Sequence, residues 1–247
     1  MKIALIGLGK MGKKIEEVAL KNGHDIALKI TSETASKVDA SSYAGIDVAI
    51  EFTRPDTAYD NIIKCIKCGI PVISGTTGWL ERINEAEEFC LQNNGTFFYS
   101  PNFSIGVNLF FEINNLLAKL MNSQIQYDEI IIHESHHTGK LDSPSGTAIA
   151  LANQTISQIK RLKQWMCYKT DENVDLSKQT TEELPIFSTR EDEIPGTHIV
   201  KYFSDVDEIE IIHKALNREG FAQGALAAAE WVKDKKGVFG MKDLLKL

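Results

Sequence analysis

The sequence lacks the features that place a protein in a membrane or on a nucleic acid. Its opening segment, residues 1–7, is apolar over only a few positions before glycines begin, which is too short for a signal-peptide core or a membrane span. The formal net charge of -7 provides no positive field for a nucleic-acid backbone or an anionic membrane surface. We therefore expect a soluble, cytoplasmic protein that binds neither.

Cysteine is also scarce, with 4 residues among 247 at irregular spacing, which argues against a disulfide framework. Cys65 and Cys68 form a single CxxC within a helical pattern, and no second pair follows to complete a zinc site. The overall composition, 43% hydrophobic and 25% charged, is that of a globular protein with one large or two modest domains.

In the first part of the chain, short β-rich apolar runs alternate with amphipathic stretches. We predict strands over residues 2–6, 25–30, 48–52, 71–74 and 96–100, and helices over 10–21, from 55 onward and over 79–92. This alternation is typical of the α/β class, here a Rossmann-type, doubly wound parallel sheet.

The pattern changes after residue 103. A helix over 107–121 and a strand over 127–134 come before three strands, 186–190, 198–204 and 208–216, which we expect to be antiparallel neighbours; residues 169–183 are predicted as loop. These elements predict a second, α+β domain built on a mixed or antiparallel sheet.

A last helix over 220–233 carries apolar residues at helical spacing and is expected to return to the first domain. We therefore predict a dinucleotide-binding domain of residues 1–103 plus 217–247. Residues 104–216 are predicted to form the substrate-binding and oligomerisation domain.

The turn Gly7-Leu8-Gly9-Lys10-Met11-Gly12 directly follows the first predicted strand and opens the first helix, which is the context that a GxGxxG turn needs to bind a dinucleotide. Gly7 permits the tight turn, Gly9 lets backbone amides approach a pyrophosphate, and Gly12 allows close helix packing. The alternative is a glycine turn in an α/β domain that binds no nucleotide.

The end of the second strand leaves the choice between NADH and NADPH open. An acid that would grip the adenosine ribose of NAD does not stand cleanly there. Thr31 or Ser32, with help from Lys29 or Lys37, could accept a 2′-phosphate, while Glu33 could still reach a ribose hydroxyl.

Further cofactor contacts are expected at the carboxyl ends of later strands, where open α/β sheets bind ligands. The predicted positions are Phe52 in the segment 51–53, Gly75, Thr76 and Thr77 in one turn, and Ser100, Pro101, Asn102 and Phe103 in the next. Together these loops trace a path of cofactor length.

The side chains best suited to catalysis are concentrated in residues 133–148. His136, His137 and Lys140 concentrate cationic groups in one loop, and the amides near Gly146 and Thr147 open a helix, so the segment suits a substrate with carboxylates, preferably two. A histidine or a lysine could deliver the proton that accompanies hydride reduction of a double bond. Because the two histidines are adjacent and not at metal-helix spacing, we expect no metal.

The run 136–148 resembles the signature of the 4-hydroxy-tetrahydrodipicolinate reductase family of bacterial lysine and diaminopimelate synthesis. The resemblance extends, in family order, to residues 7–12, 51–55, 75–78, 101–108, 196–198 and 221–225. It implies that His136 is the active-site proton donor or acceptor and Lys140 a second donor. It also implies that His137, Gly146 and Thr147 hold substrate carboxylates, that NADH or NADPH binds at the glycine turns, and that the protein is a homotetramer.

Three positions depart from the family pattern. Ser143 stands where alanine is usual, Asp192 where glycine is usual, and Thr31-Ser32 replaces the acidic-basic pair that reads the adenosine ribose. Two other functions stay open: another two-domain NAD(P)-dependent dehydrogenase, and a non-catalytic dinucleotide-binding sensor.

Overall fold

The computed structural model describes residues 1–169 and 180–247, and these residues fall into two compact units. The first unit is Met1–Asn108 with Arg218–Leu247, and the second is Leu109–Asn217. The sequence-based boundaries were 103/104 and 216/217. Within the described residues, every helix is too short or too polar to cross a bilayer.

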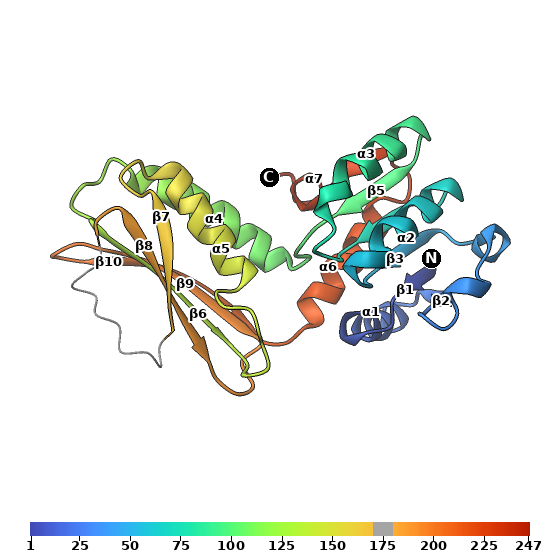
Figure 1. Ribbon diagram of the computed structural model, residues 1–247, viewed down its shortest axis with the longest axis horizontal. Coiled ribbons are helices and arrows are strands. Elements are labelled where there is room, and N and C mark those ends of the chain that lie inside the picture. Colours follow the sequence, from blue (N-terminus) through green and yellow to red (C-terminus); the bar gives the residue numbers. More distant parts are fainter. Residues whose placement is uncertain (170–179) are drawn as a thin grey trace. The chain divides into compact units, whose positions relative to one another are not determined.

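The first unit is built on a parallel sheet with the strand order β11-β5-β4-β3-β1-β2 (Figure 1). Its elements in chain order are β1 (Lys2–Ile6), α1 (Lys10–Lys21), β2 (Asp25–Ile30), η1 (Ala35–Lys37), η2 (Ala40–Tyr43), β3 (Val48–Glu51), α2 (Pro55–Lys67), β4 (Val72–Ser74), η3 (Leu80–Arg82), α3 (Ile83–Gln92), β5 (Thr96–Tyr99), α6 (Glu219–Trp231), β11 (Gly237–Phe239) and α7 (Met241–Leu245).

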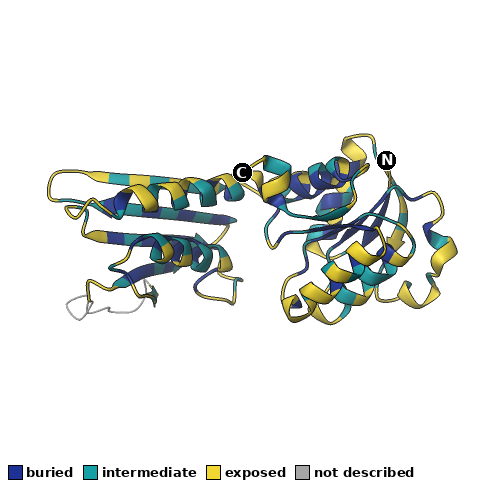
Figure 2. Cartoon of the chain, turned by 90° about the horizontal axis from the view of Figure 1, so that it is seen from above, coloured by how far each residue is buried: buried dark blue, intermediate teal, exposed yellow. Residues whose placement is uncertain are grey.

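Helices cover both faces of this sheet because its strands are apolar on both sides. In β1, Ile3 and Leu5 pack with α1 and α6, whereas Ala4 and Ile6 pack with α2 and α3. The two layers of helices bury the central strands β1, β3, β4 and β5 over most of their length, while the edge strands β2 and β11 are only partly buried; Figure 2 shows buried strands and exposed outer sides of the helices. The predicted doubly wound parallel sheet is confirmed.

Helix α6 returns to the first unit, as predicted, and packs closely against the segment that follows β5. A Cβ atom on Gly224 would lie 1.8 Å from the backbone oxygen of Phe103, so only glycine fits there. Leu226, Ala229 and Val232 are buried on the same helix or at its end.

The second unit is built on a sheet with the strand order β10-β9-β6-β8-β7. Its elements are most of α4 (Ile105–Met121), β6 (Glu129–His136), α5 (Gly146–Gln158), β7 (Gln164–Lys169), β8 (Glu183–Arg190), β9 (Gly196–Phe203) and β10 (Glu208–Ala215). Apolar residues of α4 and α5 pack on the inner face of the sheet, against Ile132, Ile186 and Val200 among others. The sheet contains both parallel and antiparallel pairs, which confirms the predicted mixed sheet.

One predicted strand pairing is wrong. Strands β8 and β9 are not neighbours, because β6 lies between them and pairs parallel with β8 and antiparallel with β9. The predicted antiparallel pairing of β9 with β10 is confirmed. The prediction overlooked β7 and β11, and most of the predicted loop 169–183 lies outside the described residues.

Candidate active site

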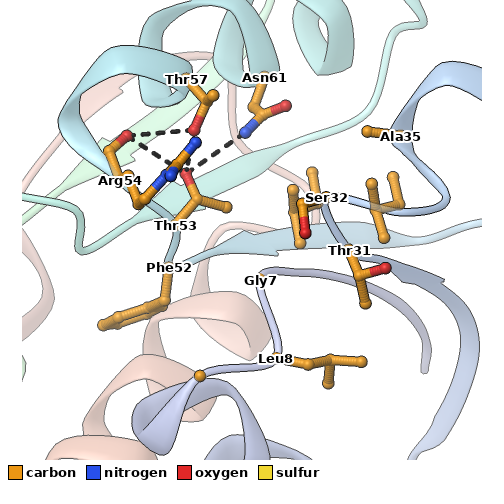
Figure 3. A pocket seen from close by; sticks show the side chains of 13 residues that line it. Gly7, Leu8, Thr31, Ser32, Ala35, Phe52, Thr53, Arg54, Thr57 and Asn61 are labelled. Carbon is orange, nitrogen blue, oxygen red and sulfur yellow. Dashed lines mark hydrogen bonds between the residues drawn. The ribbon is translucent and has the colours of Figure 1, made fainter.

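A cavity of about 420 Å³ lies in the first unit where β1, β2 and β3 end (Figure 3). Its lining consists of Ile6, Gly7, Leu8, Gly9, Ile30, Thr31, Ser32, Ala35, Phe52, Thr53, Arg54, Thr57 and Asn61. Of the predicted cofactor residues, the structure brings together Gly7, Leu8, Gly9, Thr31 and Phe52 around this one cavity. Lys10, Met11 and Gly12 follow in the first turn of α1.

The three glycines of the turn have different roles. Gly7 has a φ of 93°, and a Cβ there would lie 2.0 Å from the Phe52 backbone oxygen; a Cβ on Gly12 would lie 2.0 Å from the Gly7 oxygen. Gly9 faces open space, and no side chain caps α1 behind it. No side chain therefore covers the first backbone amides of α1, and these amides can bind a dinucleotide pyrophosphate.

Phe52 connects the cavity to the other predicted cofactor turns. Its ring is so close to Gly75 that a Cβ there would lie 2.2 Å from Phe52 Cε1, and its centroid is 5.7 Å from that of Phe103. Thr76 Oγ1 accepts a 2.8 Å hydrogen bond from the Thr53 amide. Thr77, Ser100, Pro101 and Asn102 lie in the same turns after β4 and β5, outside the lining of the cavity.

The cation at this cavity is not one of the lysines named from the sequence. Lys29 Nζ lies 2.5 Å from a carboxylate oxygen of Glu16, and neither Lys29 nor Lys37 lines the cavity. Arg54 lines it instead, and Thr31 and Ser32 line the same cavity. Arg54 was not predicted as a cofactor residue, because a cavity formed by three strand ends is not visible in a linear pattern.

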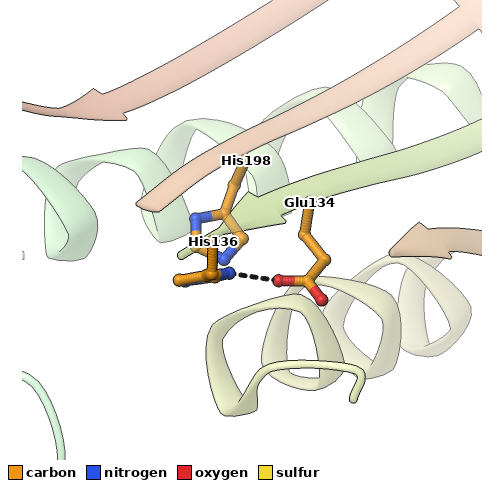
Figure 4. A group of neighbouring side chains, drawn as sticks. All are labelled: Glu134, His136 and His198. Carbon is orange, nitrogen blue, oxygen red and sulfur yellow. Dashed lines mark ion pairs between the residues drawn. The ribbon is translucent and has the colours of Figure 1, made fainter. Parts of the chain in front are cut away.

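In the second unit, His136 is paired with a buried carboxylate. Its Nδ1 forms an ion pair with Glu134 Oε2, and the His198 ring lies 5.1 Å away, centroid to centroid (Figure 4). The strand register explains this cluster: Glu134 lies opposite His198 on β9 and opposite Ser188 on β8. All of these side chains point to the buried inner face of the sheet.

Three groups keep Glu134 ionised. Burial raises the pKa of its carboxyl, but hydrogen bonds from His136, Ser188 and Arg190 outweigh burial and lower the pKa to about 2. Arg190 Nη1 donates to Glu134 Oε1 at 2.9 Å, and the Ser188 hydroxyl donates to the same oxygen.

Lys140 lies in the loop after β6, where it forms an ion pair with Asp142. Its Nζ is 2.8 and 2.9 Å from the two carboxylate oxygens of Asp142. Burial pushes the pKa of Asp142 upward, but the hydrogen bond from Lys140 holds it below its usual value. His137 lies in the same turn, since the Lys140 amide donates to its carbonyl at 3.0 Å.

The amino end of α5 approaches the same cluster through His198. Ser145 caps the helix by accepting from the Ala148 amide at 3.2 Å, and its Oγ lies 2.9 Å from His198 Nε2. Gly146 and Thr147 follow in the first turn of α5, and Gly146 has open space beside its Cα. The predicted catalytic and substrate residues therefore lie on neighbouring segments of one unit.

Glu134, His136 and His198 offer atoms within 4.8 Å of one another, a spacing compatible with a metal ion. The carboxylate of Glu134 is already occupied, however. His136 Nδ1 and Glu134 pair with each other, and the guanidinium of Arg190 occupies the other carboxylate oxygen, so a second cation would be repelled. The arrangement suits proton transfer better than metal binding.

Sequence comparisons decide the family. Residues 1–103 match the family described as dihydrodipicolinate reductase, N-terminus, and residues 106–245 match dihydrodipicolinate reductase, C-terminus. The chain belongs to the 4-hydroxy-tetrahydrodipicolinate reductase family. The family resemblance stated from the sequence is confirmed.

Individual relatives agree with this assignment. A 4-hydroxy-tetrahydrodipicolinate reductase of Christiangramia forsetii is 47% identical over 245 residues, covering 99% of this chain and 98% of the relative. The enzyme of the same name from Neisseria meningitidis serogroup B is 35% identical, covering 94% and 84%. The solved structure of dipicolinate-bound dihydrodipicolinate reductase from Paenisporosarcina sp. TG-14 has a TM-score of 0.78 at 21% identity, covering 98% of both chains, and thus shares the fold.

We predict that His198 makes the fold of this chain sensitive to acid. Burial, with the charge of His136, lowers the pKa of His198 to about 3, whereas an unfolded histidine takes up its proton near pH 6.5. The unfolded state is therefore stabilised as the pH falls below 6.5, and this one group costs about 2 kcal/mol by pH 5. Urea unfolding between pH 7.5 and 5 should show a shallower loss of stability in His198→Gln. Parallel curves for the two proteins would contradict this account.

Proposed function

We propose that the chain reduces 4-hydroxy-tetrahydrodipicolinate to tetrahydrodipicolinate, with NADH or NADPH, in lysine and diaminopimelate biosynthesis. The observation that carries this proposal is full-length membership of the reductase family together with the His136–Glu134 pair in the second unit. The solved relative binds dipicolinate, a ring with two carboxylates, and this supports a doubly carboxylated substrate here.

Each unit supplies one part of the chemistry. The bare amino end of α1 and the cavity beside it would hold the cofactor's pyrophosphate and adenosine. When bound, a reduced nicotinamide supplies a hydride. His136 would donate the accompanying proton, with Lys140 as a second donor whose charge stabilises developing negative charge. His137 and the amides near Gly146 and Thr147 would hold the carboxylates.

The purified protein should oxidise NADH or NADPH when it is supplied with the aldol product of pyruvate and aspartate semialdehyde. His136→Gln and Lys140→Ala should each lower kcat by about 100-fold or more, since general acid catalysis contributes on this order, without weakening cofactor binding. Absorbance at 340 nm gives the rate, and cofactor fluorescence gives the Kd.

Two outcomes would favour other functions. Cofactor binding without turnover, and tolerance of substitutions at both positions, would indicate a dinucleotide sensor. Turnover only with a sugar or amino-acid substrate would indicate a different two-domain dehydrogenase.

We further propose that NADPH is the preferred reductant. The described residues that line the cavity include no acid, and they include Arg54 together with Thr31 and Ser32, whose charge and hydroxyl groups suit a 2′-phosphate. Arg54→Ala should raise the KM for NADPH about 10-fold, the scale of one charge-assisted hydrogen bond, and leave that for NADH nearly unchanged. Arg82→Ala, whose partner is Glu85 outside the cavity, is the matched control. Equal effects on both cofactors would refute the role of Arg54.

We propose that the protein is a homotetramer in which other copies of the chain cover the outer face of the second sheet. The proposed location is the cytoplasm. Among the described residues, helices pack on the inner face of the sheet, while Ile212 on β10 is 56% exposed and Met166 on β7 is 41% exposed. Exposed apolar residues on a sheet face that also carries the Lys201–Glu210 ion pair suit contact with another copy.

Sedimentation equilibrium of the purified chain should give four copies, and Ile212→Asp should dissociate them because it places a charge in the covered face. Leu91→Asp is the control, since Leu91 is 62% exposed on α3 of the other unit. An unchanged mass for Ile212→Asp, with a native circular dichroism spectrum, would exclude this face.

A further inference from the structure

Glu134 and Arg190 connect the two proposed proton donors to each other. Glu134 is 1% exposed and pairs with His136 on one carboxylate oxygen and with Arg190 on the other. Arg190 also reaches the loop of Lys140, because its Nη2 donates to the Asp142 carbonyl at 2.6 Å. A single chain of polar contacts thus runs from His136 to the segment that carries Lys140.

We propose that Glu134 and Arg190 are positioning residues of the reductase reaction: the carboxylate fixes the ring of His136, and the guanidinium fixes the loop of Lys140 relative to that ring. The proposal rests on the function proposed above and adds two residues that would act through the donors without touching the substrate.

The pairing with Glu134 determines which nitrogen of His136 can react. His136 Nδ1 is buried, yet 11% of the side chain is exposed, so the exposed part belongs to the rest of the ring. A carboxylate facing Nδ1 keeps a proton on that nitrogen and leaves Nε2 to exchange its proton with a ligand. A Cβ at residue 196 would lie 3.0 Å from Nε2, so glycine there leaves room for the ring in this orientation.

Arg190 performs a task that a lysine could not. Its planar guanidinium places Nη1 at 2.9 Å from Glu134 and at 2.7 Å from the Thr189 carbonyl, while Nη2 holds Asp142. An ammonium is a point charge that cannot span these acceptors in fixed directions. The Asp142 carboxylate then holds Lys140 Nζ, so the position of Lys140 depends on Arg190 through two contacts.

The test compares wild type with Glu134→Gln and Arg190→Lys. Glu134→Gln should lower kcat by about 100-fold or more, as loss of an orienting carboxylate does in other histidine pairs, with cofactor Kd unchanged. Arg190→Lys keeps the charge and should lower kcat by about 10-fold or more. The matched control is Glu230→Gln, which removes the carboxylate 2.9 Å from His24 Nε2 in the other unit and should leave kcat as it is.

Nitrogen NMR of histidine-labelled protein supplies a readout that a purely structural role would not move. In wild type, His136 should carry its proton on Nδ1; in Glu134→Gln, this signal should shift toward the other tautomer or become a mixture, while that of His24 stays. Full kcat and unchanged His136 signals in Glu134→Gln would overturn the proposal. So would a loss of cofactor affinity as large as the loss of kcat.

The NMR measurement needs no substrate, so it separates this proposal from the proposed function. Wild type that fails to turn over, yet shows His136 protonated at Nδ1, would refute the reaction and retain the pairing. If Glu134→Gln does not fold, Arg190→Lys and the wild-type spectrum still decide: unchanged kcat in Arg190→Lys, or a wild-type His136 without a proton on Nδ1, would overturn the proposal.

Discussion

The candidate site in the second unit depends on the interactions that keep the buried carboxylate of Glu134 charged. A carboxylate removed from water is stable only when donors replace the lost hydration, and Glu134 has a guanidinium, an imidazole and a hydroxyl. Glu51 provides a contrast in the first unit. It is equally buried at the end of β3, but its side-chain partners are the hydroxyls of Ser74, Thr53 and Thr76, and burial raises its pKa. The two glutamates therefore differ in pKa because only one of them has cationic partners.

One face of strand β6 contributes residues to both the hydrophobic core and the candidate site. Its alternate residues Ile130 and Ile132 pack under the helices, and the next two inward positions are Glu134 and His136. The packed apolar half of the strand sets its register with β8 and β9. This register places Glu134 beside Ser188 and His198. Site geometry and fold stability are thus properties of one strand.

Periodicity was enough to predict most of the first unit, because buried parallel strands are apolar runs that stand out between helices. The short β11 lacks that signal and was missed; β7 was missed although Trp165–Tyr168 is a short apolar run. Pairing order is not encoded locally, so β8 and β9 were wrongly placed together. In the site, the loop with His136 and Lys140 was visible as a linear cluster. Glu134 could have been found, since it lies two residues before His136 and so shares its face. Ser188 and Arg190 depend on register, which only the folded sheet reveals.

The two departures from the family pattern beside the loop have structural partners. Ser143 Oγ donates to Ser188 at 2.8 Å, and Asp192 accepts from Thr138 Oγ1 at 2.6 Å. Arg190 also donates to the Asp142 carbonyl. The end of β8 and the residues just after it therefore contact the loop at Thr138, near its start, and at Asp142 and Ser143, near its end. Because β8 pairs with β6 and β7 in the sheet, the position of this loop follows from the strand register and not from the loop sequence alone.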